Sequence, residues 1–214
     1  MTTPTYDRGY WDELWARVLR EHPDRVAGRP PNAHLTRELS GLEPGRALDA
    51  GCGHGSDTLW LAAHGWRVTA VDFSAAALAH ARSTAEAAGP ELAARIEWIE
   101  ADLATWTPQT GRFELVVSLY VHVAGTVAEM VRRLAAAVAP GGTLLLVGHR
   151  PIDPVTGAAT PAAGQRQVSV DAALAALDPA EWEFVVAEDR PRAAEGTGVD
   201  AVIRATRLRA PDER

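Results

Sequence analysis

The sequence of 214 residues contains no lysine, so its 21 basic residues are all arginines. This absence excludes sites that need a lysine, such as the P-loop, the protein-kinase nucleotide site and Schiff-base catalysis. The single cysteine, Cys52, excludes an internal disulfide and a metal site built from several cysteines. The net charge of −7 argues against a partner bound through its phosphate backbone. We therefore expect neither a nucleic-acid partner nor a resident metal.

Long hydrophobic segments are missing as well. No run of about 18 apolar residues is present to span a membrane. The first eight residues lack the apolar core of a signal peptide. We therefore expect a soluble cytoplasmic protein with no membrane partner. Apolar residues make up 47% of the chain, and this length fits a single domain with a substantial core.

Aromatic residues are scarce at 6% of the chain, yet four of them lie within ten residues near the N-terminus. These are Tyr6, Tyr10, Trp11 and Trp15. Apolar residues at helical spacing predict an amphipathic helix over about 12–19. Its aromatic stripe either docks on the main core or forms a lid that contacts the ligands. We interpret residues 1–31 as an N-terminal arm, followed by a helix that Asn32 can cap.

From residue 47 the sequence alternates between short apolar runs and helical patterns. The apolar runs predict strands at 47–50, 67–71, 96–100, 113–118 and 143–147. Strand–helix alternation over about 100 residues predicts an α/β fold with a mostly parallel sheet and helices on both faces. The turn at 140–142 is expected to separate a helix over 126–139 from the fifth of these strands.

Two further strands are predicted near the C-terminus, at 182–187 and 199–207. No helix lies between them, which favours an antiparallel hairpin at one edge of the sheet. We expect Arg190-Pro191-Arg192 to form the solvent-exposed tip of this hairpin. The segment 149–167, which is rich in Pro, Gly, Ala and Thr, is either a lid that closes over a ligand or a disordered loop.

The run Leu48-Asp49-Ala50-Gly51-Cys52-Gly53-His54-Gly55 is the strongest ligand-binding signal in the chain. It reads as the end of a buried strand, a glycine-rich turn and then a helix that begins at Ser56. Glycines allow a sharp bend and the close approach of a ligand. The helix N-terminus presents N–H groups at the same place. A carboxylate at Asp49 suits a cationic ligand better than a phosphate.

Carboxylates also follow the second and third predicted strands, at the edge where open α/β sheets bind ligands. Asp72 can accept hydrogen bonds from both hydroxyls of a ribose, although capping the next helix is an alternative. Asp102 can accept from the amine of an adenine, with Phe73 and Leu103 packed on the ring. A plain turn carboxylate is the alternative for Asp102.

These motifs together resemble the class I S-adenosylmethionine-dependent methyltransferases over roughly residues 32–208. The matching segments are Asp49–Gly53, Val71–Ser74, Glu100–Leu103, Phe113–Ser118 and Leu134–Leu144, in the order and spacing of that family. The resemblance implies a Rossmann-like sheet of seven mostly parallel strands with an antiparallel C-terminal hairpin. It also implies methyl transfer from S-adenosylmethionine by in-line displacement. The N-terminal aromatics are most similar to the small-molecule branch, which includes thiopurine- and tellurite-type methyltransferases.

The resemblance further implies a role for each matching position. The turn at Gly51 and Gly53 would pass under the methionine part of the cofactor, while Asp72 would hold the ribose and Asp102 the adenine amine. Asp49 would act through the turn and nearby water. The implied cofactor-binding residues are Asp49, Ala50, Gly51, Cys52, Gly53, Asp72, Phe73, Ser74, Asp102, Leu103, Ser118 and Leu119.

The acceptor side is less defined. A base is needed only when the acceptor must lose a proton, and His122 and His149, which follow the fourth and fifth strands, are the candidates. Candidate substrate contacts are Tyr6, Tyr10, Trp11, Trp15, Tyr120 and Arg150. The sequence names neither the acceptor nor the attacked atom, and it leaves the oligomeric state open.

Two other functions stay open. A non-catalytic protein that binds S-adenosylmethionine would carry the same cofactor motifs. A nicotinamide-dependent oxidoreductase also has a glycine-rich turn and an acidic residue after its second strand, but Ser56 stands here where its third glycine belongs.

Overall fold

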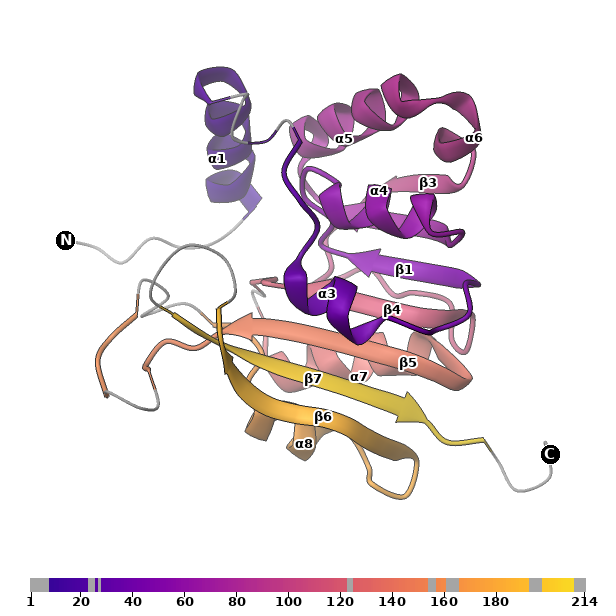
Figure 1. The fold of residues 1–214 in the computed structure, drawn as a ribbon. Coiled ribbons are helices and arrows are strands. Elements are labelled where there is room, and N and C mark those ends of the chain that lie inside the picture. The colour runs from indigo at the N-terminus through magenta and orange to yellow at the C-terminus, as the bar shows by residue number, and fades with distance from the viewer. Residues whose placement is uncertain are drawn as a thin grey trace. The chain divides into compact units, whose positions relative to one another are not determined.

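A computed structural model of the chain describes residues 8–22, 26, 28–122, 125–153, 157–160, 166–192 and 198–209. The chain divides into two compact units, residues 1–106 and residues 107–214 (Figure 1). Of the predicted site residues, Tyr6 lies outside the described ranges.

A parallel sheet in the order β3-β2-β1 forms the centre of the first unit. Its strands are β1 (Arg46–Ala50), β2 (Arg67–Asp72) and β3 (Ile96–Glu100). Every residue of β1 and β2 after the first is buried, as expected for strands that are covered on both faces. The three predicted strands are confirmed to within one residue at each end.

Five described helices accompany this sheet: α1 (Arg8–Glu21), α3 (Ala33–Glu38), α4 (Ser56–Ala63), α5 (Ala75–Ala88) and α6 (Pro90–Ala93). The predicted Asn32 cap is confirmed, because its side chain accepts from the backbone of His34. At the start of α5 the Ser74 hydroxyl accepts from Ala77 N–H. α4 packs against β1 and β2, and α1 packs against α5. The arm helix is longer than predicted, and its apolar residues are only partly buried.

The second unit contains a mixed sheet in the order β4-β5-β7-β6. The strands are β4 (Phe113–Leu119), β5 (Val138–His149), β6 (Trp182–Pro191) and β7 (Val199–Arg207). β5 runs parallel to β4 and antiparallel to β7, which pairs antiparallel with β6. α7 (Val127–Ala137) packs against β4 and β5, and α8 (Val170–Ala176) packs against β6 and β7 (Figure 1). The antiparallel hairpin is confirmed, with β6 at the edge.

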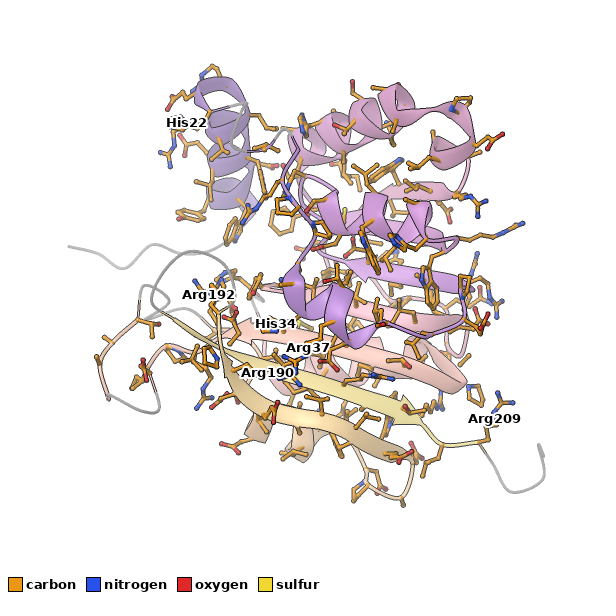
Figure 2. All side chains as sticks on the ribbon, viewed as in Figure 1. His22, His34, Arg37, Arg190, Arg192 and Arg209 are labelled. Atoms are coloured by element: carbon orange, nitrogen blue, oxygen red, sulfur yellow. The ribbon has the colours of Figure 1, made fainter. Side chains whose placement is uncertain are left out.

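β5 begins five residues earlier than the predicted strand, and α7 ends at Ala137 rather than at 139. Val138 already pairs with Phe113, and the register shifts before the regular pairing resumes. Gly141 lies within this irregular stretch at a φ of +80°, a conformation that favours glycine. The guanidinium of Arg209, which follows β7 in Figure 2, occupies the space where a Cβ of Gly141 would lie. The predicted turn is therefore an irregularity inside one strand.

Candidate cofactor and acceptor sites

The glycine-rich turn is attached to the end of β2 by its own backbone. Gly51 N–H and Cys52 N–H donate to the Val71 carbonyl at 2.8 and 3.1 Å. Gly51, Gly53 and Gly55 have φ values of +86°, +52° and +86°, so each needs the left-handed region that glycine tolerates. The three glycines therefore fix the path of the turn between β1 and α4.

Asp72 joins this turn to the start of α5. One carboxylate oxygen accepts from Gly53 N–H and the other from Ser74 N–H, both at 2.9 Å. Burial raises the pKa of the Asp72 carboxyl, while these backbone donors lower it. The Phe73 backbone N–H also acts on the carboxylate, and the two oxygens together offer about four acceptor sites, so one site remains. The carboxylate can therefore hold the turn and still accept from a ligand hydroxyl.

Asp49 faces the protein interior. Its side chain is 2% exposed and accepts from the Thr58 hydroxyl of α4 at 2.5 Å. Burial, together with the negative charge of Asp57, raises the pKa of the Asp49 carboxyl to about 7. Its place in the site is thus beneath the turn, where it ties β1 to α4.

Asp102 closes a turn after β3. Its Oδ1 accepts from Ala104 N–H at 2.8 Å, and Ala101 N–H donates to the Asp72 carbonyl at 3.0 Å. Leu103 is buried and Phe73 is half-buried. The turn role of Asp102 is therefore realised, and the ends of β2 and β3 lie next to each other. Contact with an adenine stays a prediction.

Trp15 of α1 and His54 lie against the glycine turn. A Cβ on Gly53 would lie 3.0 Å from the Trp15 ring, whose centroid is 5.4 Å from that of His54. Burial, assisted by the positive charge of Arg29, lowers the pKa of His54 to about 4. Within the described ranges, His54 Nε2 is buried without a hydrogen-bond partner. The sequence pattern favoured a helix-start role for His54 and did not place it among the site residues, although its position next to Gly53 was a signal.

Tyr10 and Trp11 also lie on α1, where their rings meet edge to face with centroids 5.3 Å apart. Both are half-buried. They and Trp15 therefore do not form a stripe that is fully buried in the core.

The second unit gathers polar side chains at the carboxyl ends of β4 and β5. Ser118 Oγ is buried and has no hydrogen-bond partner in the part of the chain that the structure describes. Tyr120, two residues on, has a φ of +59°, the one positive value among the described non-glycine residues. Such backbone typically costs about 1–3 kcal/mol and is concentrated at functional sites. The Tyr120 ring stacks on His149, with centroids 3.9 Å apart.

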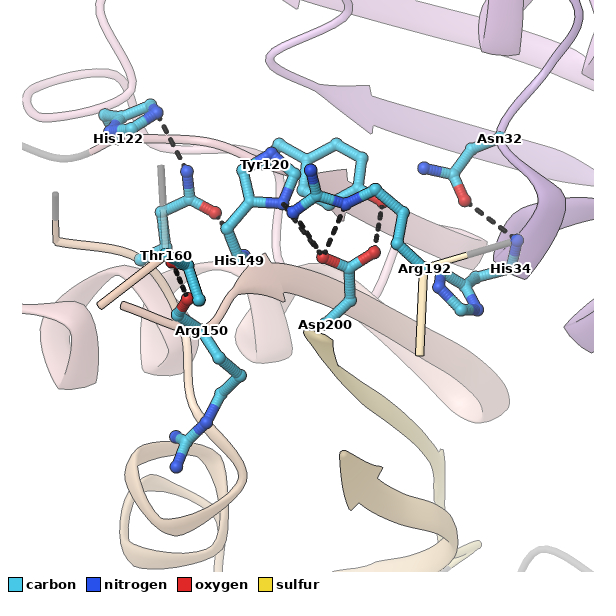
Figure 3. A network of polar contacts seen from close by, with 10 residues as sticks. Asn32, His34, Tyr120, His122, His149, Arg150, Thr160, Arg192 and Asp200 are labelled. Carbon is cyan, nitrogen blue, oxygen red and sulfur yellow. Dashed lines mark hydrogen bonds and ion pairs between the residues drawn. The ribbon is translucent and has the colours of Figure 1, made fainter. Parts of the chain in front are cut away.

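Asp200 of β7 is the centre of this group (Figure 3). It is fully buried and accepts from the Tyr120 hydroxyl at 2.8 Å. Arg192 Nη2 donates to its other oxygen at 3.1 Å, and His149 Nδ1 lies 2.9 Å from that oxygen. A buried carboxylate requires such compensation by a cation and hydrogen-bond donors.

Two residues of the group around Asp200, namely Arg192 and Asp200 itself, were not predicted from the sequence. Arg192, expected at a solvated hairpin tip, instead turns back to Asp200, because β6 extends to Pro191 and pairs Arg190 with Asp200. The signal for Asp200 was a lone acidic residue within an apolar strand.

His149 Nδ1 lies next to one hydrogen-bond donor and one hydrogen-bond acceptor. Arg192 Nη2 lies 2.6 Å from it and can only donate, whereas the ionised Asp200 carboxylate can only accept. Nδ1 therefore either donates to Asp200 or accepts from Arg192. When Nδ1 donates to Asp200, the lone pair of the neutral imidazole lies on Nε2. No described residue forms a hydrogen bond with His149 Nε2, so this atom can accept a proton.

His122 is placed differently. The Gln167 amide nitrogen donates to His122 Nε2 at 2.8 Å, while the Gln167 carbonyl oxygen accepts from His149 N–H at 2.5 Å. Burial, with the charge of His149 as a smaller cause, lowers the pKa of His122 to about 4. Its Nε2 lone pair is thus already used, which makes His122 the weaker candidate for a base.

In the described ranges, no three His, Cys, Asp or Glu side chains are grouped to hold a metal ion. Nor does any described helix have the length and apolar character needed to cross a membrane.

Residues 47–142 match the family described as "Methyltransferase domain". Trans-aconitate 2-methyltransferase of Paracidovorax citrulli is 39% identical over 137 residues, which are 62% of this chain and 49% of that protein. Ribosomal RNA small subunit methyltransferase C of Alcanivorax borkumensis is 38% identical over 114 residues, 50% of this chain and 33% of that protein. The chain thus spans about half or less of the length of these curated relatives.

Solved structures with the same fold cover nearly the whole chain. A cyclase superposes with a TM-score of 0.71 at 18% identity, over 98% of this chain and 99% of its own. An S-adenosylmethionine-dependent methyltransferase from Mesorhizobium loti has a TM-score of 0.64 at 22% identity, over 85% and 100%. The predicted seven-stranded α/β fold and the resemblance are confirmed. Residues 47–142 thus match the methyltransferase domain family, and the chain has the fold of the class I S-adenosylmethionine-dependent methyltransferases.

Proposed function

We propose that this protein transfers a methyl group from S-adenosylmethionine to a small-molecule acceptor. The observation that carries the proposal is the Asp72 carboxylate, which anchors the glycine turn and keeps accepting capacity at the end of β2. In open α/β sheets this edge is where ligands bind. The family match over the same residues supports the assignment.

The residues around the turn fit such a cofactor. His54 Nε2 next to the turn offers a buried polar atom that lacks a described partner, while the Trp15 ring fills the space where a Cβ of Gly53 would lie. Gly51 and Gly53 would hold the methionine part, Asp72 the ribose and Asp102 the adenine amine. When bound, the cofactor supplies a methyl group on a positively charged sulfur, which is an electrophile.

The chain's own contribution is then positioning and, for an acceptor with an acidic proton, a base. Holding the reactants in line can lower the barrier by about 7–11 kcal/mol. We assign the base to His149, whose Nε2 would take the proton of the acceptor. Asp200 would fix the Nδ1–H tautomer and stabilise the imidazolium that forms. Tyr120 holds the ring by stacking and by its bond to Asp200.

The acceptor is proposed to be a small molecule rather than RNA. A chain with no lysine and a net charge of −7 is poorly suited to a phosphate backbone, although one relative acts on ribosomal RNA. The fold alone does not decide between methyl transfer and other chemistry, since a cyclase shares it.

Thermal unfolding with S-adenosylhomocysteine against NADH tests the cofactor. A ligand at about 100 times its dissociation constant should add about 2.7 kcal/mol to the unfolding free energy. Only S-adenosylhomocysteine should do so, and Asp72→Asn should reduce the effect. Glu91→Gln on α6, which removes an exposed carboxylate of the same unit, is the matched control.

Transfer of a labelled methyl group to a metabolite extract, with total RNA as the comparison, tests the acceptor. Label in small molecules supports the proposal. Label in RNA alone, or cofactor binding with no transfer to either, would overturn it.

A further inference from the structure

A cavity of about 280 Å³ lies beside His149 in the second unit. Its polar lining residues are His149, Arg150, Arg166, Gln167 and Ser169, and the other three are apolar. None of the eight is acidic, although acidic residues outnumber basic ones by seven in the whole chain. The lining therefore has the opposite charge to the protein as a whole.

The two arginines differ in how their charges are compensated. Arg150 Nε lies 3.3 Å from Asp189 Oδ2, but this N–H is buried and makes no hydrogen bond of good geometry within the described residues. Arg166 is exposed, and no ion pair or hydrogen bond joins it to the described part of the chain. One positive charge in the lining is thus uncompensated.

The other polar groups of the cavity offer donors. The Ser169 oxygen accepts from Ala172 N–H, which leaves its own O–H free to donate into the cavity. Burial keeps the nearby His122 neutral by lowering its pKa to about 4. Two carboxylates lie beside the lining, and each already has a cationic partner. Asp189 pairs with Arg150. Asp200, which lies 2.9 Å from His149 Nδ1, pairs with Arg192.

We propose that this cavity binds a carboxylate group of the methyl acceptor. A single uncompensated arginine matches a singly charged carboxylate better than a doubly charged phosphate, and a guanidinium binds a carboxylate through two parallel hydrogen bonds. His149 lines the same cavity, so the bound acceptor would present its reacting atom near the proposed base. Identifying the ligand as the acceptor rests on the proposed function, whereas the carboxylate preference rests on the cavity alone.

Calorimetric titration with three acids and their amides tests the preference: acetate with acetamide, succinate with succinamide, and benzoate with benzamide. We expect at least one acid to bind about tenfold more tightly than its amide, because the amide lacks the charge. Arg166→Gln should abolish that difference. Arg132→Gln, which removes an exposed arginine of α7 in the same unit, should leave it unchanged.

Three results would overturn the carboxylate site: no acid preferred over its amide, a preference that survives in Arg166→Gln, or inorganic phosphate bound tenfold more tightly than every acid. Stabilisation by S-adenosylhomocysteine is measured in the same samples. If it is absent while the acids are preferred, the methyl-transfer proposal fails and the cavity assignment stands. If it is present without that preference, the cavity assignment alone fails.

Discussion

Replacing Asp49 with asparagine should remove a large pH-dependent cost to folding. Burial, with the charge of Asp57, raises the pKa of this carboxyl from 3.8 to about 7 in the folded protein. Between these values the folded protein holds a proton that the unfolded chain releases, so the free energy of unfolding falls as the pH rises. At about 1.4 kcal/mol per pKa unit, the full effect is about 4 kcal/mol above pH 7.

The assay must separate the effect of Asp49 on the unfolding free energy from that of two histidines, whose effect on stability has the opposite pH dependence. Burial lowers the pKa of His54 and of His122 to about 4, so both favour the folded state as the pH rises from about 4 to 6.5. The informative quantity is therefore the difference in unfolding free energy between Asp49→Asn and the wild type, from urea titrations. The unfolding free energy of the variant, relative to that of the wild type, should increase by about 3 kcal/mol between pH 5 and pH 8.

A constant difference over that range would refute the reasoning. It would mean that Asp49 stays ionised in the folded protein, with the Thr58 hydroxyl stabilising its charge. Asp171→Asn on α8 serves as the control, since this carboxyl lies in the first turn of an unrelated helix.

Four further outcomes follow from the described contacts. Asp72→Asn should weaken S-adenosylhomocysteine binding about 10- to 100-fold in calorimetry, because a charge-assisted hydrogen bond contributes about 1.5–3 kcal/mol; unchanged affinity would remove the ribose assignment. Asp200→Asn should lower kcat more than it raises KM and should change the pH–rate profile. A variant that loses stability but keeps the wild-type pH–rate profile would indicate a purely structural role. Gly53→Ala should destabilise the fold by about 1–2 kcal/mol in urea titrations, from its positive φ. Adding Trp15→Ala to the Gly53→Ala variant should restore only the part of the lost unfolding free energy that comes from the close contact with the Trp15 ring. Restoration of the whole loss would exclude backbone strain as its cause.

The geometry of the proposed cofactor site in the first unit was largely predictable from the sequence. Strand periodicity and glycine spacing placed Asp49, Asp72 and Asp102 near the ends of β1, β2 and β3, where they lie. What could not be predicted was where each carboxylate points. Asp49 turns inward to Thr58 because a buried hydroxyl is available on α4, and that contact depends on helix packing.

The proposed acceptor site in the second unit was less predictable, because its contacts join residues far apart in the sequence. Tyr120 and Asp200 are 80 residues apart, and His149 and Asp200 are 51 apart. Their meeting depends on β7 lying next to β5 and on the register of the hairpin, neither of which leaves a local pattern.

The position of β7 between β5 and β6 has a consequence for how this protein can change over evolutionary time. Asp200 and Arg192 lie far downstream of the glycine turn in the sequence. Variation or recombination in the segment that encodes β6 and β7 can therefore alter the proposed acceptor site while the proposed cofactor-binding turn is inherited intact.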